Sequence, residues 1–335
     1  MRYLFALILC LLASVSGAQD WEDRQRFGPA DASRVLRVLS STDTALFEPL
    51  LRSFVAVNAD TAIDYLVAST SELDQIFRQT PEAYDVVISS AMDLQFKLAN
   101  DGFARPLEDF PYPGWAQWRR SLFAFTSEPA AIVINRDAFA GLDIPHTRQD
   151  LIRVLRDRPT LFQGRVGTYD VRQSGVGYLF ATQDARTSET YWRLMEVMGG
   201  LQTQLYCCSG EMIEDVASGR IAVAYNVLAS YAVARADLAD QIEVIVPSDF
   251  QTIMMRTALV SARTPRPAHA QVFVAHLLRQ KAAAGGGSAT SLPGLDLTRD
   301  AAGQSTIPLQ PALLTYLDTL KSAGFFKDWT DAVIQ

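Results

Sequence analysis

The sequence predicts an α/β protein with two similar lobes, because one local pattern occurs in two groups along the chain. In this pattern a short apolar strand leads into a turn rich in Ser, Thr and Asp, and an amphipathic helix follows. Three such units fall within residues 35–102 and three more within residues 164–232. With 335 residues, of which 49% are hydrophobic, the chain can build two cores. We therefore expect each lobe to be a mixed sheet flanked by helices.

The first eighteen residues have the features of a secretory signal peptide. Arg2 precedes an apolar run from Tyr3 to Ala13, and the small residues Ser16 and Ala18 fit a cleavage site. The run is shorter than the roughly 18 apolar residues that a membrane span requires. We expect cleavage after Ala18 and export to the periplasm, with residues 19–33 as an extended lead-in.

Small hydroxyl side chains gather where the first three strands end. These strands are expected at residues 35–39, 63–67 and 85–88, and amphipathic helices follow them. In an open α/β sheet, ligands bind outside the carboxyl ends of the strands, where helix N-termini offer unpaired N–H groups. Each hydroxyl could instead cap only its own helix, but three successive pairs favour a site. The candidate ligand-binding residues here are Ser40, Ser41, Thr42, Ser69, Thr70, Ser89 and Ser90.

The middle of the chain repeats this order of elements. One strand is expected over residues 123–135, and a helix that opens at Pro145 and Thr147 follows. Further strands are expected at residues 164–169, 202–208 and 221–225, and each leads into a helix. Gly175 lets the backbone approach a ligand closely, but the glycines do not complete a dinucleotide fingerprint. The candidate ligand-binding residues here are Arg172, Ser174, Gly175, Ser209, Tyr225 and Asn226.

The last third of the chain should complete both lobes. Strands are expected at residues 242–246 and 252–261, and a helix at residues 268–279. Residues 281–305 contain a run of glycines and are expected to form a loop. Residues 308–335 have the apolar spacing of an amphipathic helical segment.

The adjacent pair Cys207 and Cys208 is all that remains of the cysteines once Cys10 leaves with the signal peptide. Two neighbouring cysteines cannot link distant parts of a fold. They could form a strained vicinal disulfide, but we expect two buried side chains at the end of an apolar strand. We expect no metal site, because neither a second cysteine pair nor a nearby histidine accompanies them.

The charge and the histidine content indicate binding rather than catalysis. The net charge is -7, which argues against nucleic acid or an anionic membrane as partner. A serine hydrolase needs a base, and the chain offers His146, His269 and His276, none in a G-x-S-x-G context. We therefore expect a binding protein that needs no cofactor, and a monomer.

Several motifs in their order resemble a known family. They are VLSSTD, STSEL, DVVISSAMDLQFKLANDGFA, EPAAIVINRDAF, TYDVRQSGVGYLF, YNVLASYA and LLTYLDTLKSAGF. The chain resembles the extracytoplasmic substrate-binding proteins of ABC transporters, with the type II periplasmic-binding fold, in the iron(III)-type branch. The resemblance implies a ligand cleft between two lobes and two hinge crossings, near residues 128–134 and 254–260. It implies a first lobe of residues 35–130 plus 258–335 and a second lobe of residues 131–257.

The resemblance also bears on the ligand. Iron binders of this family hold the metal with two consecutive tyrosines, where this chain has Tyr225-Asn226, and often with a histidine in the first turn. The incomplete set makes ferric iron the alternative. Arg172 suits a carboxylate or a phosphate, unless it pairs with Asp170 or Glu211 at the surface. We predict a small anionic solute, an organic carboxylate or a sugar phosphate, delivered to an ABC permease or sensed by a membrane histidine kinase.

Overall fold

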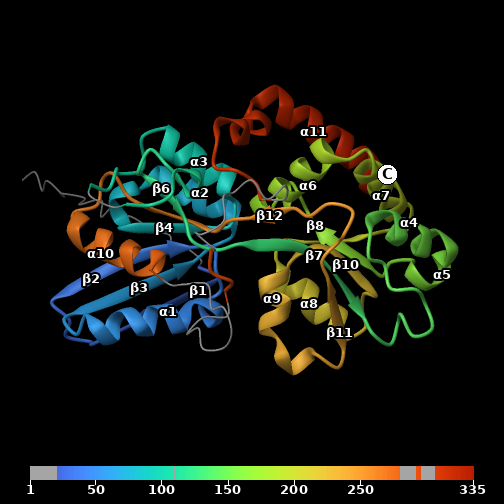
Figure 1. The fold of residues 1–335 in the computed structure, drawn as a ribbon, viewed down its shortest axis with the longest axis horizontal. Helices are drawn as coiled ribbons and strands as arrows, with labels where there is room; N and C mark the ends of the chain where they lie inside the picture. The colour runs from blue at the N-terminus through green and yellow to red at the C-terminus, as the bar shows by residue number, and fades with distance from the viewer. Residues whose placement is uncertain (1–20, 109–110, 280–291, 296–305) are drawn as a thin grey trace, which may run out of the picture.

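The computed structural model describes residues 21–108, 111–279, 292–295 and 306–335. The predicted signal peptide and most of the predicted loop at residues 281–305 lie outside the described residues. Two lobes stand side by side, and each contains a mixed sheet with helices on both faces (Figure 1). The predicted two-lobe α/β fold is confirmed.

The first sheet has the strand order β1-β3-β2-β4-β13-β6-β5. Its strands β2 (Arg34–Ser40), β3 (Thr61–Val67) and β4 (Val86–Ser89) are parallel, so their carboxyl ends lie at one edge. At the far side, β1 (Asp23–Phe27) pairs antiparallel with β3. The predicted lead-in therefore contains an edge strand. The remaining strands are β5 (Gln117–Trp118), β6 (Leu122–Ala124) and β13 (Thr257–Val260).

Helices cover both faces of this sheet because successive strand residues point to opposite sides. In β2, Val38 lies in the core beneath α1 (Thr44–Val57) and α10 (Pro267–Leu278), where Phe54 packs edge-on against Phe273. The next residue, Leu39, lies in the core beneath α2 (Thr70–Gln79) and α3 (Met92–Asn100). Alternation along one strand thus builds two cores. The 3-10 helices η1 (Pro81–Ala83) and η2 (Gly114–Ala116) belong to the connections of this lobe.

The second sheet has the order β11-β7-β10-β8-β9, and β12 pairs with β7. Here β8, β9 and β10 run parallel, so their carboxyl ends also share one edge. The strands are β7 (Glu128–Asn135), β8 (Val166–Tyr169), β9 (Gln204–Tyr206), β10 (Val223–Leu228), β11 (Ile242–Ile245) and β12 (Ile253–Met254). The helices are α4 (Arg148–Asp157), α5 (Pro159–Phe162), α6 (Gly175–Thr187), α7 (Thr190–Gly200), α8 (Ser209–Ala217), α9 (Ala229–Ala234) and η3 (Ala236–Leu238).

Two predicted strands are each divided between the sheets. The strand expected at residues 123–135 is β6 in the first sheet and β7 in the second, and residues 125–127 cross between them. Likewise β12 pairs in the second sheet and β13 in the first, and residues 255–256 cross. The chain therefore crosses just before residues 128–134 and within residues 254–260.

The C-terminal segment packs on both lobes. The 3-10 helix η4 (Pro311–Leu317) contacts α3 of the first lobe, whereas α11 (Thr319–Val333) contacts α7 of the second lobe. Trp329 and Val333 of α11 are buried in the core of the second lobe. The assignment of residues 258–335 to the first lobe therefore does not describe α11, whose apolar face is covered by the other lobe. None of the helices in the described parts of the chain has the length and apolarity to cross a membrane.

Candidate functional site

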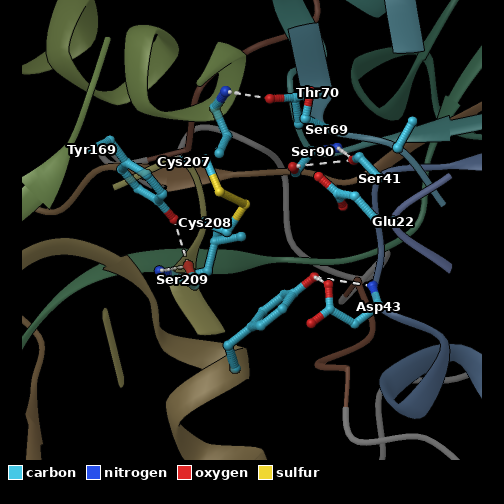
Figure 2. Close-up of a pocket in the computed structure, with 14 residues that line it drawn as sticks. Glu22, Ser41, Asp43, Ser69, Thr70, Ser90, Tyr169, Cys207, Cys208 and Ser209 are labelled. Carbon is cyan, nitrogen blue, oxygen red and sulfur yellow. Dashed lines mark hydrogen bonds between the residues drawn. A yellow bond between two sulfur atoms is a disulfide. The ribbon is translucent and has the colours of Figure 1, made fainter. Parts of the chain in front are cut away.

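The parallel strands of both sheets direct their carboxyl ends at one cavity between the lobes (Figure 2). The first lobe contributes the turns after β2, β3 and β4, and the second lobe the ends of β8, β9 and β10. The cavity has a volume of about 40 Å³, room for only a few water molecules. Its lining consists of Glu22, Ser41, Asp43, Ala68, Ser69, Thr70, Ser90, Tyr169, Val176, Cys207, Cys208, Ser209, Leu228 and Tyr231.

Four of the predicted first-lobe hydroxyls line this cavity. Ser41 Oγ accepts a hydrogen bond from the Ser90 N–H at 3.2 Å, so these two turns are joined. Ser69 caps α2 by accepting from the Glu72 N–H at 3.3 Å. Thr70 follows it at the cavity wall. Ser69 therefore both caps its own helix and lines the cavity.

Thr70 also reaches the second lobe. Its Oγ1 accepts hydrogen bonds from the N–H groups of Gly175 at 2.8 Å and Val176 at 3.3 Å, at the start of α6. Ser174 is buried and caps the same helix. A Cβ on Gly175 would lie 3.0 Å from Leu94 Cδ1 and 3.1 Å from Thr70 Oγ1, so a glycine allows this close approach. The predicted Ser174 and Gly175 thus serve the contact between the lobes.

Three predicted hydroxyls lie behind the cavity wall. Ser40 is buried and accepts a hydrogen bond from the Tyr65 hydroxyl at 2.8 Å. Thr42 accepts from Arg256 Nη1 at 2.7 Å, and Ser89 accepts from the Ala91 N–H at 3.1 Å. Their hydroxyls satisfy buried donors and position the turns that carry Ser41 and Ser90.

Arg172 lies outside the lining and pairs with Asp170. The guanidinium donates to the Asp170 carboxylate at 2.8 and 2.6 Å, and the Arg172 side chain is 44% exposed. Burial would raise the pKa of Asp170, but the Arg172 guanidinium outweighs it and holds that pKa below its usual value. The structure therefore matches the surface ion pair that was the alternative for Arg172.

Tyr225 and Asn226, which stand where iron binders have two tyrosines, belong to a buried hydrogen-bond network. Tyr225 Oη donates to Asp184 Oδ2 at 2.7 Å and accepts from Arg148 Nε at 2.6 Å. Asn226 Nδ2 donates to the same Asp184 oxygen at 3.0 Å. Both side chains are buried, and neither belongs to the cavity lining. The geometry thus directs both residues into the second lobe.

The second-lobe wall is largely made of residues that sequence reasoning missed. The Tyr169 hydroxyl lies 2.5 Å from Ser209 Oγ, which also accepts from the Leu228 N–H at 3.2 Å. Ser209 was a candidate, but Tyr169 and Tyr231 were not. Tyr169 is the last residue of β8 and Tyr231 lies in α9, and aromatic side chains at such positions are typical of core residues.

Cys207 and Cys208 form a vicinal disulfide, so the expectation of two buried side chains is wrong. The physical reason is that β9 ends at Tyr206, which places both cysteines in the turn before α8. Each side chain is only half-buried and lines the cavity. The adjacency of the two cysteines was the feature of the sequence that indicated a disulfide. Their position in a turn, and not inside a strand, accounts for the oxidised state.

Two carboxylates at the cavity were also missed. The Tyr231 hydroxyl donates to Asp43 Oδ1 at 3.2 Å and so joins the two lobes. Burial in the wall raises the pKa of Asp43, although its side chain keeps an exposed part. Burial also raises the pKa of Glu22, and the Asp43 charge adds to this shift. Asp43 stands in the predicted SSTD turn, whereas Glu22 lies in the lead-in and gave no signal.

Comparisons with known proteins place this geometry in a family. Residues 82–304, about two thirds of the chain, match the family model described as bacterial extracellular solute-binding protein. No curated protein matches the sequence. The substrate-binding protein of an ABC transporter from Agrobacterium tumefaciens is 29% identical, with a TM-score of 0.85 over 93% of this chain and 98% of that chain.

Two further structures share the fold at lower identity. AfuA from Actinobacillus pleuropneumoniae, with fructose-6-phosphate bound, has 13% identity and a TM-score of 0.71 over 90% of this chain and 99% of that chain. Iron-bound HitA from Pseudomonas aeruginosa has 15% identity and a TM-score of 0.63 over 89% and 99%. The family resemblance of the sequence motifs is thereby confirmed. The chain belongs to the bacterial extracellular solute-binding proteins, the class that supplies substrates to ABC transporters.

Proposed function

We propose that this protein is exported to the periplasm, captures a small anionic solute between its lobes and delivers it to an ABC permease in the inner membrane. The observation that carries this proposal is the cavity, whose wall is shared by the two lobes. A solute that contacts both walls would stabilise the closed arrangement. Because the cavity is narrow, the lobes must separate before a solute enters. The cleavable signal peptide of residues 1–18 belongs to this proposal.

The helix starts at the cavity support an anionic solute. Ser69 and Thr70 stand at the start of α2, Ser90 just before α3, and Cys208 at the start of α8. In α3 the Leu94 N–H already donates to Asp93 Oδ1 at 2.9 Å, whereas no side chain caps α8, so N–H groups of its first turn are available to a ligand. Such N–H groups and the positive end of the helix dipole favour carboxylate and phosphate groups. Arg172 lies outside the lining and is paired with Asp170, so we assign it no contact with the solute.

The carboxyl groups of Glu22 and Asp43 restrict the chemical class of the solute further. Glu22 and Asp43 line the cavity, and their carboxyl groups can accept hydrogen bonds from a bound molecule. Hydroxyl groups provide the donors, whereas a simple carboxylate or inorganic phosphate provides few. We therefore propose a hydroxylated anion, either a sugar phosphate or a hydroxy acid.

A thermal-shift panel of matched pairs tests this proposal. Fructose 6-phosphate is compared with inorganic phosphate, and malate with succinate, because a ligand that binds the folded state raises the melting midpoint. We expect the hydroxylated member of at least one pair to give the larger rise. Equal shifts within both pairs would contradict the hydroxylated class. No shift with any small organic anion would contradict the anionic class itself.

Two alternatives have specific tests. Ferric iron has less support, because Tyr225 is engaged by Arg148 and Asp184. No group of three potential metal ligands from His, Cys, Asp and Glu gathers among the residues that the structure describes. A charge-transfer absorption band on addition of ferric iron would restore this alternative. Pull-down from membranes would separate a permease partner from a sensor kinase.

A further inference from the structure

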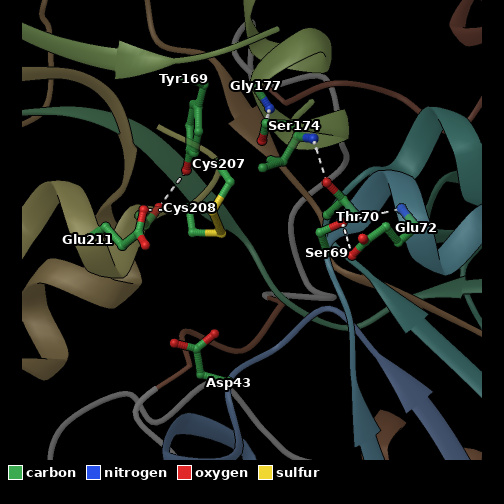
Figure 3. The surroundings of a disulfide bond; sticks show 12 residues. Asp43, Ser69, Thr70, Glu72, Tyr169, Ser174, Gly177, Cys207, Cys208 and Glu211 are labelled. Carbon is green, nitrogen blue, oxygen red and sulfur yellow. Dashed lines mark hydrogen bonds between the residues drawn. A yellow bond between two sulfur atoms is a disulfide. The ribbon is translucent and has the colours of Figure 1, made fainter. Parts of the chain in front are cut away.

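The Cys207–Cys208 disulfide stands in the wall of the cavity, between β9 and α8 (Figure 3). Across the cavity it faces Glu22, Ser41 and Ser90 of the first lobe (Figure 2). The sulfur pair therefore belongs to the surface that a bound solute would meet.

This disulfide cannot serve to staple the fold. The stabilisation that a disulfide gives through the unfolded chain grows with the length of the loop it closes. Cys207 and Cys208 are adjacent, so the bond restricts almost nothing beyond its own turn. Its contribution must be local, and at this position the local feature is the cavity wall.

The neighbouring structure holds the sulfur pair in place. Ser209, the next residue, is buried and is bonded to both the Tyr169 hydroxyl and the Leu228 N–H. The turn that carries the disulfide is therefore fixed to β8 and β10. A fixed pair of sulfur atoms offers a solute a rigid, polarisable surface that has no hydrogen-bond donor.

The rest of the lining gives this surface a distinct role. Most lining side chains are hydroxyls or carboxylates, and the aliphatic ones are Ala68, Val176 and Leu228. A hydroxylated anion has carbon-bound hydrogens as well as polar groups. The disulfide can cover the carbon skeleton while the polar groups bind the opposite wall.

We propose that the oxidised Cys207–Cys208 pair is a contact surface that determines solute specificity, and that its reduction by a dithiol lowers solute affinity. This inference rests on the proposed function. In the step, the dithiol supplies two electrons and two protons. The Sγ–Sγ bond breaks, each cysteine gains a thiol proton, and the dithiol closes to its cyclic disulfide.

Reduction changes the wall in two ways. The two sulfur atoms are no longer bonded, so they move apart and the shape of the wall changes. The Cys207 sulfur lies 3.8 Å from Glu211 Oε2, and a thiol at that position can donate to this carboxylate. The rigid donor-free surface is replaced by two mobile thiols.

The experiment compares three forms in a Cys10→Ser background, which leaves Cys207 and Cys208 as the cysteines present. They are the oxidised protein, the protein reduced with dithiothreitol, and the double variant Cys207→Ala/Cys208→Ala. Each is titrated calorimetrically with fructose 6-phosphate and with malate. We expect about tenfold weaker binding in the reduced form and in the double variant, or about 1.4 kcal/mol. Dithiothreitol should leave the double variant unchanged, and that is the control for other effects of the reductant.

The outcomes separate the two proposals. Equal affinity of all three forms would overturn the role of the disulfide and leave the proposed function standing. If neither compound binds the oxidised protein, the proposed solute class fails, and this inference fails with it. Ligand-free melting of the double variant should stay close to that of the oxidised protein. A large loss there would mean that the bond has a structural role, which contradicts the inference.

Discussion

The two lobes are joined in two places that differ in kind. At the hinge, Arg256 and Glu128 form a fully buried ion pair with N–O distances of 3.0 and 2.9 Å. Thr42 of the first lobe accepts from Arg256, and Ser230 of the second lobe donates to Glu128. At the cavity, two hydrogen bonds connect Thr70 with the start of α6, and two more connect Asp43 with Tyr231.

This difference indicates where motion can occur. Breaking a buried charge pair leaves an uncompensated charge, whereas each hydrogen bond between uncharged donors and their acceptors at the cavity contributes only about 1 kcal/mol net. The hinge pair, Arg256 and Glu128, should therefore persist while the cavity contacts open and close. A binding protein needs this combination, because a cavity contact that is too strong would keep the lobes shut without solute.

The largest effect is expected at the hinge pair. Glu128→Gln leaves the fully buried Arg256 without its carboxylate, and we expect the free energy of unfolding to fall by about 3–5 kcal/mol. Denaturant unfolding measures this loss. The control is Asp60→Asn, which breaks the exposed pair with Arg34 and should change stability little. Equal losses in both variants would remove the distinction between hinge and surface pairs.

The next effect concerns Asp93, beside the cavity contacts in α3. Burial raises the pKa of Asp93 to about 7, and the Asp74 charge adds to the shift. The folded protein therefore holds this proton more tightly than the unfolded chain, so stability falls as pH rises from about 4 to about 7. Asp93→Asn removes this dependence. At pH 8 we expect the variant to unfold at a higher denaturant concentration than the wild type. Its free energy of unfolding should be higher by up to about 4 kcal/mol.

The difference between the wild type and Asp93→Asn should nearly vanish at pH 4, where Asp93 is protonated in the fold. Urea unfolding of both proteins at pH 4, 6 and 8 measures it, and the comparison cancels the other titrating groups. A difference that does not change with pH would mean that the Asp93 carboxyl is not held protonated by the fold.

A smaller effect is expected from Gly175→Ala at the cavity contact. The new Cβ would lie 3.0 Å from Leu94 Cδ1 and 3.2 Å from the Ala91 Cβ, both in the first lobe. Crowding there opposes closure but not the folding of either lobe, at a cost of about 1–3 kcal/mol. Small-angle scattering should show a more open molecule, and unfolding should be nearly unchanged. An unchanged scattering profile together with lower stability would place the strain inside one lobe.

The sequence predicts the first-lobe wall better than the second, for physical reasons. Ser41 and Ser90 follow apolar strands directly, so local pattern places them at the carboxyl edge. Tyr169 reads as a core residue, because burial of its ring does not reveal where the hydroxyl lies. Arg172 shows what residue type alone does not predict. A cationic side chain near a site can form an ion pair with a carboxylate two residues away, as Arg172 does with Asp170. Glu22 joins the cavity only through strand pairing of β1 with β3, which the sequence does not specify.

The smallest effect is expected from Thr70→Val, which keeps the shape of the side chain and removes the acceptor for the Gly175 and Val176 N–H groups. Both N–H groups can turn to water once the lobes separate, so the loss falls on the closed form, at about 1 kcal/mol. Solute affinity should therefore weaken about fivefold, since only the closed form holds the solute with both walls. Calorimetric titration with fructose 6-phosphate measures the affinity, and Thr80→Val, an exposed threonine at the end of α2, is the matched control. If Thr70→Val instead lowered stability as Glu128→Gln does, this contact would belong with the hinge, and the distinction between a permanent and a separable connection would fail.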